Sequence, residues 1–107
     1  MLDAVFHALA DPTRRQMIER LTRGAASVSE LAAPLQMSMP GVMQHLKVLD
    51  AAGLTVSEKR GRVRWCRLDA TALASAEAWI GERRRLWEAR LDALDRHLRA
   101  DPGKDKR

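Results

Sequence analysis

The chain has 107 residues, of which 46% are hydrophobic and 31% are charged. This is the size and apolar content of one small globular domain, so we expect one domain and not two. The 19 Lys and Arg residues exceed the 14 Asp and Glu residues, so the net charge is +5. Such an excess favours a polyanionic partner, either nucleic acid or an acidic membrane surface.

The positive charge is concentrated in one short segment. Residues 1–54 carry five basic and five acidic side chains, which cancel. Residues 55–68 have a net charge of +4, because one acidic side chain, Glu58, stands among five basic ones: Lys59, Arg60, Arg62, Arg64 and Arg67. The position of the charge is therefore more informative than its total.

The single cysteine, Cys66, excludes an intrachain disulfide and leaves no thiol cluster for a structural zinc site. The N-terminal residues lack the pattern of a leader peptide, and no run of 18 uncharged apolar residues occurs. We therefore expect a cytoplasmic protein with no membrane segment, no metal and no cofactor.

The first third of the chain has the spacing of short amphipathic helices. Asp11 followed by Pro12 predicts the N-cap and first turn of one helix, and Ser27 with Glu30 has the spacing of a capping box that begins another. A helix of about three turns is predicted before them by apolar residues at i, i+3, i+4 and i+7, namely Leu2, Val5, Phe6 and Leu9.

A fourth helix is predicted to begin at Ser38, which has the residue type of an N-cap. Val42, Leu46 and Leu49 recur at helical spacing until Gly53 ends the element. It follows the capping-box helix after only a few residues. Two short helices with this separation are typical of a helix-turn-helix.

The polar face of this fourth helix predicts contact with DNA. The Gln44 amide can both donate and accept, which matches adenine N6 and N7 in the major groove, and Lys47 supplies charge to phosphate. Pro40 and Gly41 lie on the same face, and a glycine lets backbone approach DNA closely. The alternative is an ordinary solvated helix face, because Gln and Lys are common surface residues.

Residues 55–68 are predicted to form a basic β-hairpin, with Gly61 supplying the positive φ of a tight turn. Alternation places Arg62, Arg64 and Cys66 on one face and Val63 and Trp65 on the other, and the sequence leaves open which face is buried. Guanidinium groups at the tip suit phosphate contact or insertion into the minor groove. The tip arginines are Arg60, Arg62 and Arg64. The alternative interpretation is a loop that is charged only for solubility.

A long amphipathic helix of about 27 residues is predicted after Asp69 or Thr71, and at 1.5 Å per residue it spans about 40 Å. A domain of this size has a radius of gyration of only about 13 Å, so it cannot cover both sides of such a rod. We expect a two-fold dimer that buries apolar residues of the terminal helices: Leu2, Val5, Phe6, Leu73, Trp79, Ile80, Leu86, Trp87, Leu91, Leu94 and Leu98. Residues 1–100 then form the domain, and residues 101–107 form a polar tail.

Four runs of residues carry a resemblance to a known family: HALADPTRR at 7–15, SELA at 29–32, SMPGVMQHLKVL at 38–49 and AGL at 52–54. From about Phe6 to Leu98 the chain resembles the ArsR family of winged-helix transcriptional repressors. The resemblance implies a homodimer joined through its terminal helices that binds an operator and releases it on a signal. It also implies reading positions and wing contacts at Ser38, Met39, Pro40, Gly41, Gln44, His45, Arg60, Arg62 and Arg64.

The chain departs from the family pattern at the recognition helix and at the metal sites. Family members often have a polar or basic residue in place of Met39 and a serine in place of Met43, so base readout here relies more on thymine methyl groups. Metal-sensing members resemble one another in a Cys-Val-Cys-Asp run where this chain has residues 27–30, and hydroxyls are poor ligands for thiophilic metals. Asp95 and His97 stand at i and i+2 and point apart, so we expect no metal site.

Two alternatives for individual sites stay open. Cys66 has arginine neighbours that would lower its pKa and favour a redox-active thiolate, whereas a lone strand cysteine is more often a small core residue. The sequence also leaves open whether a small molecule or a redox change is the effector that releases the protein from DNA. No Ser-His or Cys-His arrangement of a nucleophile occurs, so we expect no enzyme.

The combined prediction is a mainly α-helical winged helix-turn-helix with a small β-hairpin, which dimerises through its terminal helices. Its function is that of a sequence-specific regulator, a homodimeric repressor of an operator palindrome in double-stranded DNA. The alternative function is a protein-interaction module that uses the long amphipathic helix without specific DNA binding.

Overall fold

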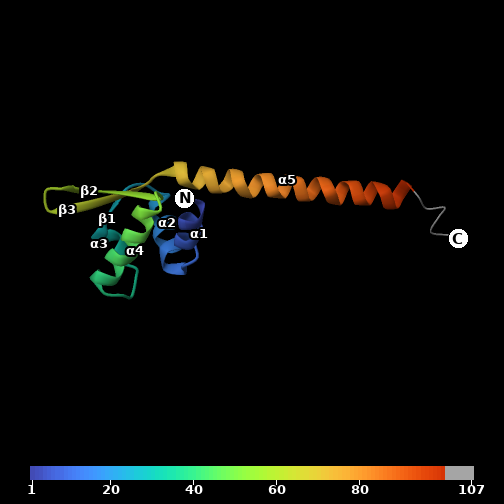
Figure 1. Cartoon of the computed structure of the whole chain (residues 1–107). Helices are drawn as coiled ribbons and strands as arrows, with labels where there is room; N and C mark the ends of the chain where they lie inside the picture. Colours follow the sequence, from blue (N-terminus) through green and yellow to red (C-terminus); the bar gives the residue numbers. More distant parts are fainter. Residues whose placement is uncertain (101–107) are drawn as a thin grey trace. The chain divides into compact units, whose positions relative to one another are not determined.

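The computed structural model describes residues 1–100, and the predicted polar tail at 101–107 lies outside the described residues. The elements follow in the order α1 (Leu2–Leu9), α2 (Pro12–Leu21), β1 (Ala26–Ser27), α3 (Val28–Ala32), α4 (Met39–Ala51), β2 (Thr55–Arg60), β3 (Val63–Leu68) and α5 (Ala70–Ala100) (Figure 1). They form two compact units, Met1–Ala76 and the part of the chain from Glu77 onward. The mainly helical fold with a basic hairpin is confirmed.

The predicted N-caps of α2 and α3 are present. The Arg14 amide donates to the Asp11 carboxylate at 2.9 Å and keeps the pKa of Asp11 below its ordinary value. Ser27 and Glu30 form the reciprocal capping box, in which each backbone N–H donates to the other side chain at 3.1 Å. The Ser27 amide likewise keeps the pKa of Glu30 low. Both helices therefore begin at residues that satisfy their free N–H groups.

The core of the first unit is built from one apolar stripe of each helix, as the 3.6-residue period predicts. α4 contributes Val42, Leu46 and Leu49, which are at most 1% exposed. The other elements add the buried residues Val5, Ala8, Met17, Leu21, Leu31, Leu54, Cys66, Ala72 and Ala76. Val5, predicted at a dimer interface, lies fully inside this core, and Leu2 and Leu73 pack against it as half-buried residues.

The sheet has three antiparallel strands in the order β1-β3-β2, one more than the predicted hairpin. β1 contributes only Ala26 and Ser27, which pair with Cys66 and Trp65. A two-residue strand has no periodicity, which is why no pattern in the sequence indicates it. Gly61 has φ of +65° in the turn between β2 and β3, as predicted.

The last helix, α5, has 31 residues, so its length is about 46 Å at 1.5 Å per residue. The Asp69 carboxylate accepts from the Thr71 amide at 3.0 Å, which confirms the predicted cap. Beyond Ala76 its large apolar side chains are exposed. None of the helices within residues 1–100 has the length and hydropathy needed to cross a membrane.

Candidate nucleic-acid interface

Helix α4 is divided into a buried and an exposed face, as predicted. Ser38 caps it, and its hydroxyl accepts from the Gly41 amide at 3.3 Å. Gln44 and Lys47 are exposed on the side opposite the buried apolar stripe. The first turn is exposed as well, with Met39 at 46% and Pro40 beside it. The exposed groups of α4 are therefore its N-terminal turn, one amide and one ammonium.

Gly41 has space for a side chain inside the protein itself. A Cβ added there would meet the Ser38 hydroxyl oxygen at 3.4 Å and the Met37 methyl carbon at 3.6 Å, which are ordinary contact distances. Packing within the described chain therefore does not require glycine at this position.

Two grooves lie between α4 and the wing, which comprises β2, Gly61, Arg62 and β3. The larger, of about 430 Å³, is lined by Pro40, Met43, Gln44, Leu46, Lys47, Asp50 and Arg64. The smaller, of about 230 Å³, is lined by Ser27, Val28, Ser29, Met39, Met43, Arg62, Val63 and Arg64. Four of the residues predicted to contact DNA from α4 line these grooves together with two of the three predicted wing arginines: Met39, Pro40, Gln44 and Lys47.

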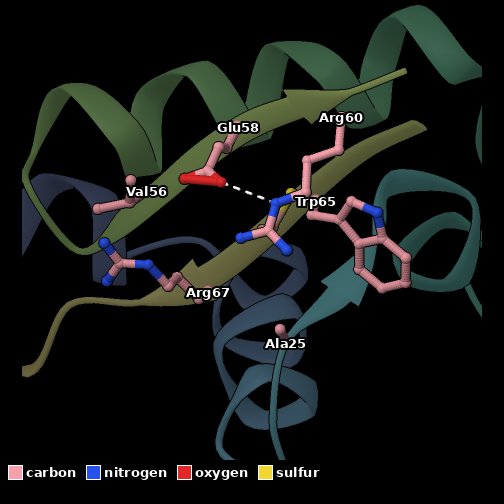
Figure 2. Close-up of a pocket in the computed structure, with 7 residues that line it drawn as sticks. Ala25, Val56, Glu58, Arg60, Trp65 and Arg67 are labelled. Carbon is pink, nitrogen blue, oxygen red and sulfur yellow. Dashed lines mark hydrogen bonds and ion pairs between the residues drawn. The ribbon is translucent and has the colours of Figure 1, made fainter. Parts of the chain in front are cut away.

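The third wing arginine, Arg60, faces the other side of the sheet. Its Nε lies 2.9 Å from the Glu58 carboxylate, and Figure 2 shows the two joined next to the Trp65 ring. They line a small pocket of about 80 Å³ together with Ala25, Val56, Cys66 and Arg67. Arg60 is therefore ion-paired on the face that turns away from α4.

The two faces of the hairpin differ in burial, which answers the question that alternation left open. Cys66 is 1% exposed and Trp65 is 37% exposed. Cys66 belongs to the buried core cluster of the first unit, so its side of the hairpin is the one that packs on the helices. Arg64 shares the Cys66 side nearer the tip, and this alternation is what brings it to the α4 grooves.

The net pKa shift of Cys66 is opposite to the one predicted from its arginine neighbours. Burial raises the pKa of this thiol, and the opposing effects of the Ser57 hydroxyl and of Arg64 are smaller. The thiol lies 3.7 Å from the Ser57 hydroxyl, inside the core. A thiol with a raised pKa holds its proton at neutral pH, so Cys66 is a small core residue.

Sequence reasoning missed a polar link between α4 and the wing. The Asp50 carboxylate accepts hydrogen bonds from the Thr55 hydroxyl and, at 2.8 Å, from the Ser57 hydroxyl. Asp50 stands in the last turn of α4, where the helix dipole disfavours an anion. That unfavourable position was the available signal of a specific partner, and the link fixes β2 to the end of the recognition helix.

A second missed link involves the residue predicted to read DNA beside Gln44. His45 Nδ1 lies 3.2 Å from a guanidinium nitrogen of Arg14 and 3.9 Å from the Asp11 carboxylate. The imidazole is 19% exposed. The structure thus places His45 against the start of α2, whereas Gln44 and Lys47 are exposed.

The described part of α5 beyond Ala76 carries a row of exposed apolar residues and many charges. Its predicted interface residues Trp79, Ile80, Leu86, Trp87, Leu91, Leu94 and Leu98 are between 42% and 60% exposed. The Arg83 guanidinium lies 4.6 Å from the Trp79 ring centroid. Asp95 pairs with Arg99 at 3.1 Å. Within residues 1–100 no group of three or more His, Cys, Asp and Glu side chains has the arrangement of a metal site.

The arrangement of α3, α4 and a basic hairpin defines the winged helix-turn-helix class of DNA-binding proteins. Residues 9–58 match a family described as "Helix-turn-helix domain". The chain is 48% identical over 73 residues to the HTH-type transcriptional regulator Rv2034 of Mycobacterium tuberculosis, a match that covers 68% of each chain.

Solved structures give the same result at the level of the fold. A crystal structure of an ArsR family transcriptional regulator is 46% identical, with a TM-score of 0.78, and the match covers 81% of this chain and 90% of that one. An ArsR-like transcriptional regulator from Rhodococcus sp. RHA1 is 34% identical, with a TM-score of 0.76 and coverage of 89% and 90%. The chain belongs to the ArsR family of DNA-binding transcriptional regulators, as its motifs predicted.

Proposed function

We propose that this protein is a homodimeric repressor that binds an imperfect palindrome in double-stranded DNA. One observation carries the proposal: the exposed face of α4 and two wing arginines line the same pair of grooves. In each protomer α4 enters the major groove, and the half-sites lie about one turn, roughly 34 Å, apart. Occupation of a promoter then blocks transcription, which is a regulatory role and not a catalytic one.

On α4, Gln44 reads a base edge through its amide and Lys47 contacts phosphate. The N-terminal turn approaches the DNA most closely, because the positive end of the helix dipole favours phosphate. Ser38, Met39, Pro40 and Gly41 form that turn. Met39 and Met43 supply apolar surface suited to thymine methyl groups.

In the wing, Arg62 and Arg64 contact the backbone that flanks the major-groove site. Both line the grooves next to α4, and a guanidinium fork matches the geometry of phosphate. Arg60 takes a smaller part, because it faces away from α4 and is paired with Glu58. We therefore expect the Arg62 and Arg64 side of the hairpin to contribute more to DNA binding than the Arg60 side.

The dimer is proposed to form through α5, and Leu2 and Phe6 of α1 are further candidates for the interface. The exposed row on α5 offers seven large apolar side chains in the described residues, and burial of apolar surface contributes about 25 cal/mol per Å². A second copy of the chain presents the same row, as two-fold symmetry requires. A dimer also matches a palindromic site, because two recognition helices then read two half-sites.

The experiment is selection of duplexes from a random-sequence library by the full chain, together with footprinting on the DNA upstream of its own gene. We expect one enriched palindrome and protection of two half-sites about one turn apart. Sedimentation of the free protein should give a dimer. A monomer without affinity for duplex DNA would instead support a protein-interaction module built on α5.

A further inference from the structure

Arg14 joins three helices through one side chain. Its Nε donates to the Ala8 carbonyl at 2.7 Å and its Nη2 donates to the His7 carbonyl at 3.0 Å, so it satisfies two carbonyls at the end of α1. Its backbone amide caps α2 through the Asp11 carboxylate. Its Nη1 lies 3.2 Å from Nδ1 of His45, near the middle of α4. One guanidinium therefore links the junction of α1 and α2 to the recognition helix.

This contact requires a neutral imidazole. A guanidinium has donors only, so Nδ1 of His45 must present its lone pair to Arg14, and the ring proton is then on Nε2. A second proton on Nδ1 would replace the hydrogen bond by a contact between two cations. The nearest acceptor for that proton is Asp11, whose Oδ2 lies 3.9 Å away. Protonation therefore favours Asp11 over Arg14 as the partner of the ring.

The charged groups that contact this imidazole come from the start of α2. The start of α2 supplies Arg14 and Asp11, and α1 supplies His7, whose backbone carbonyl holds Arg14 in place. On α4 itself only uncharged residues stand one turn away from His45: Gly41, Val42, Val48 and Leu49. Arg14 and Asp11 thus both lie within 4 Å of the ring nitrogen Nδ1.

The link restricts a motion that apolar packing leaves free. Val42, Leu46 and Leu49 bury one face of α4, but apolar attraction has no direction and tolerates a small rotation or slide of the helix. A hydrogen bond does have a direction, and its strength falls steeply when the angle is lost. The Arg14 contact is thus suited to set the rotation of α4 about its axis.

We propose that Arg14 is a positioning residue for DNA binding, which holds α4 in its groove-matching orientation through neutral His45, and that protonation of His45 weakens operator binding. This inference rests on the proposed function, in which α4 enters the major groove. It assigns His45 to the support of the recognition helix, whereas Gln44 reads the base.

The expected pH dependence has a distinctive sign. Histidine side chains titrate between pH 5 and 8, and an added positive charge by itself strengthens binding to the phosphate backbone. General electrostatics therefore predicts tighter DNA binding on acidification. Our inference predicts weaker binding, and only on DNA that α4 reads.

The test is fluorescence anisotropy between pH 5.5 and 7.5 at constant ionic strength. One probe is a duplex that the protein selects from a random library at pH 7.5, and the other is a scrambled duplex of equal length and composition. We expect affinity for the selected duplex to fall about threefold to tenfold at pH 5.5, which is part of the effect of one charge-assisted hydrogen bond. Affinity for the scrambled duplex should stay constant or rise.

Three variants separate positioning from folding. His45→Gln keeps an acceptor for Arg14 but does not titrate, so the fall at pH 5.5 should disappear. Arg14→Lys keeps the charge but loses the planar fork, so it should weaken binding to the selected duplex more than to the scrambled one. His7→Gln keeps the carbonyl that Arg14 binds and is the matched control with the wild-type profile. Thermal unfolding at both pH values verifies that each variant is folded.

The outcomes distinguish a failure of the positioning role of Arg14 from a failure of the proposed function. A wild-type affinity that stays constant or rises on acidification overturns the inference and leaves the proposed function intact. A wild-type pH profile in His45→Gln does the same. If the protein selects no duplex at pH 7.5, the proposed function fails, and the inference fails with it.

Discussion

The unit Met1–Ala76 and the following part of α5 differ in how deeply their large apolar side chains are buried. In the first unit, the largest core side chains are less than 2% exposed, among them Met17, Leu31, Leu46, Leu49 and Leu54. Beyond Ala76, the large apolar side chains of the described helix are 42% to 60% exposed. Short helices and a sheet can cover one another, whereas one helix has no second layer. The first region therefore completes a core, whereas the apolar side chains of the second region stay exposed in the single chain.

The largest expected effect comes from opening the closed core. Leu46→Ala removes a side chain that is 1% exposed, and such a change costs about 2–5 kcal/mol of unfolding free energy because a cavity remains. Urea unfolding measures it. The control is Lys47→Ala on the exposed face of the same helix, which should stay within about 0.5 kcal/mol of the wild type. A loss below about 1 kcal/mol for Leu46→Ala would show that the core of the first unit is not closed.

A substitution in the exposed apolar row of α5 should affect the proposed dimer and not the stability of the single chain. Leu91→Glu changes an exposed residue, so the stability of the single chain should change by no more than about 0.5 kcal/mol. The proposed dimer would bury two unpaired carboxylates, and we expect its dissociation constant to rise at least about a hundredfold, or about 3 kcal/mol. Sedimentation measures this change. Arg96→Gln changes the net charge equally and should leave the dimer intact, while a dimeric Leu91→Glu protein would contradict the α5 interface.

Within the first unit, the buried face of α4 should affect stability, whereas its exposed face should affect DNA binding. Gln44→Ala should cost about 1–3 kcal/mol on the selected operator and relax the preference at one base pair. The reason is that the lost hydrogen bonds go to a base edge and not to phosphate. Competition binding with operator and scrambled duplexes measures the difference. Equal losses on both duplexes would assign Gln44 to the backbone.

Gly41→Ala separates stability from binding at a single position. Alanine favours a helix by about 1 kcal/mol over glycine, and the added methyl group meets only ordinary contacts inside the chain. The melting temperature should therefore stay equal or rise. Operator affinity should fall by about 1–2 kcal/mol, because the methyl group stands between the helix and the DNA. Unchanged affinity would remove Gly41 from the interface.

The smallest effect compares the two sides of the wing. Arg62→Ala should weaken binding to all sequences and lower the salt dependence of log K by about one per protomer, as expected for one lost phosphate contact. Arg60→Ala should change the slope less, because Arg60 is paired with Glu58 on the far face. Titrations at several salt concentrations measure both slopes. Equal slopes for the two variants would contradict the assignment of sides.

Much of the fold could be predicted because its signals are local. The caps at Asp11, Ser27 and Ser38 involve residues three apart, and the structure has all three. The buried and exposed faces of α4 follow from the helical period. The DNA-facing candidates Gln44 and Lys47 are exposed for the same reason.

The missed features join residues that are far apart in the chain or too few to form a pattern. β1 pairs Ala26 with Cys66, and Arg14 meets His45 across 31 positions. The burial of Cys66, and with it the direction of its pKa shift, depended on which hairpin face meets the helices. No local spacing encodes such choices.

The sequence by itself determined the winged helix-turn-helix class, the family and the position of the charge, because caps, helical periods and motifs are properties of neighbouring residues. Only the tertiary structure showed that Arg62 and Arg64 of the wing stand beside α4 and that Arg60 does not. It also decided that Asp50 fixes the wing and that His45 faces Arg14. The physical reason is that hydrogen bonds and buried faces depend on where distant segments meet, and packing of the core sets those positions.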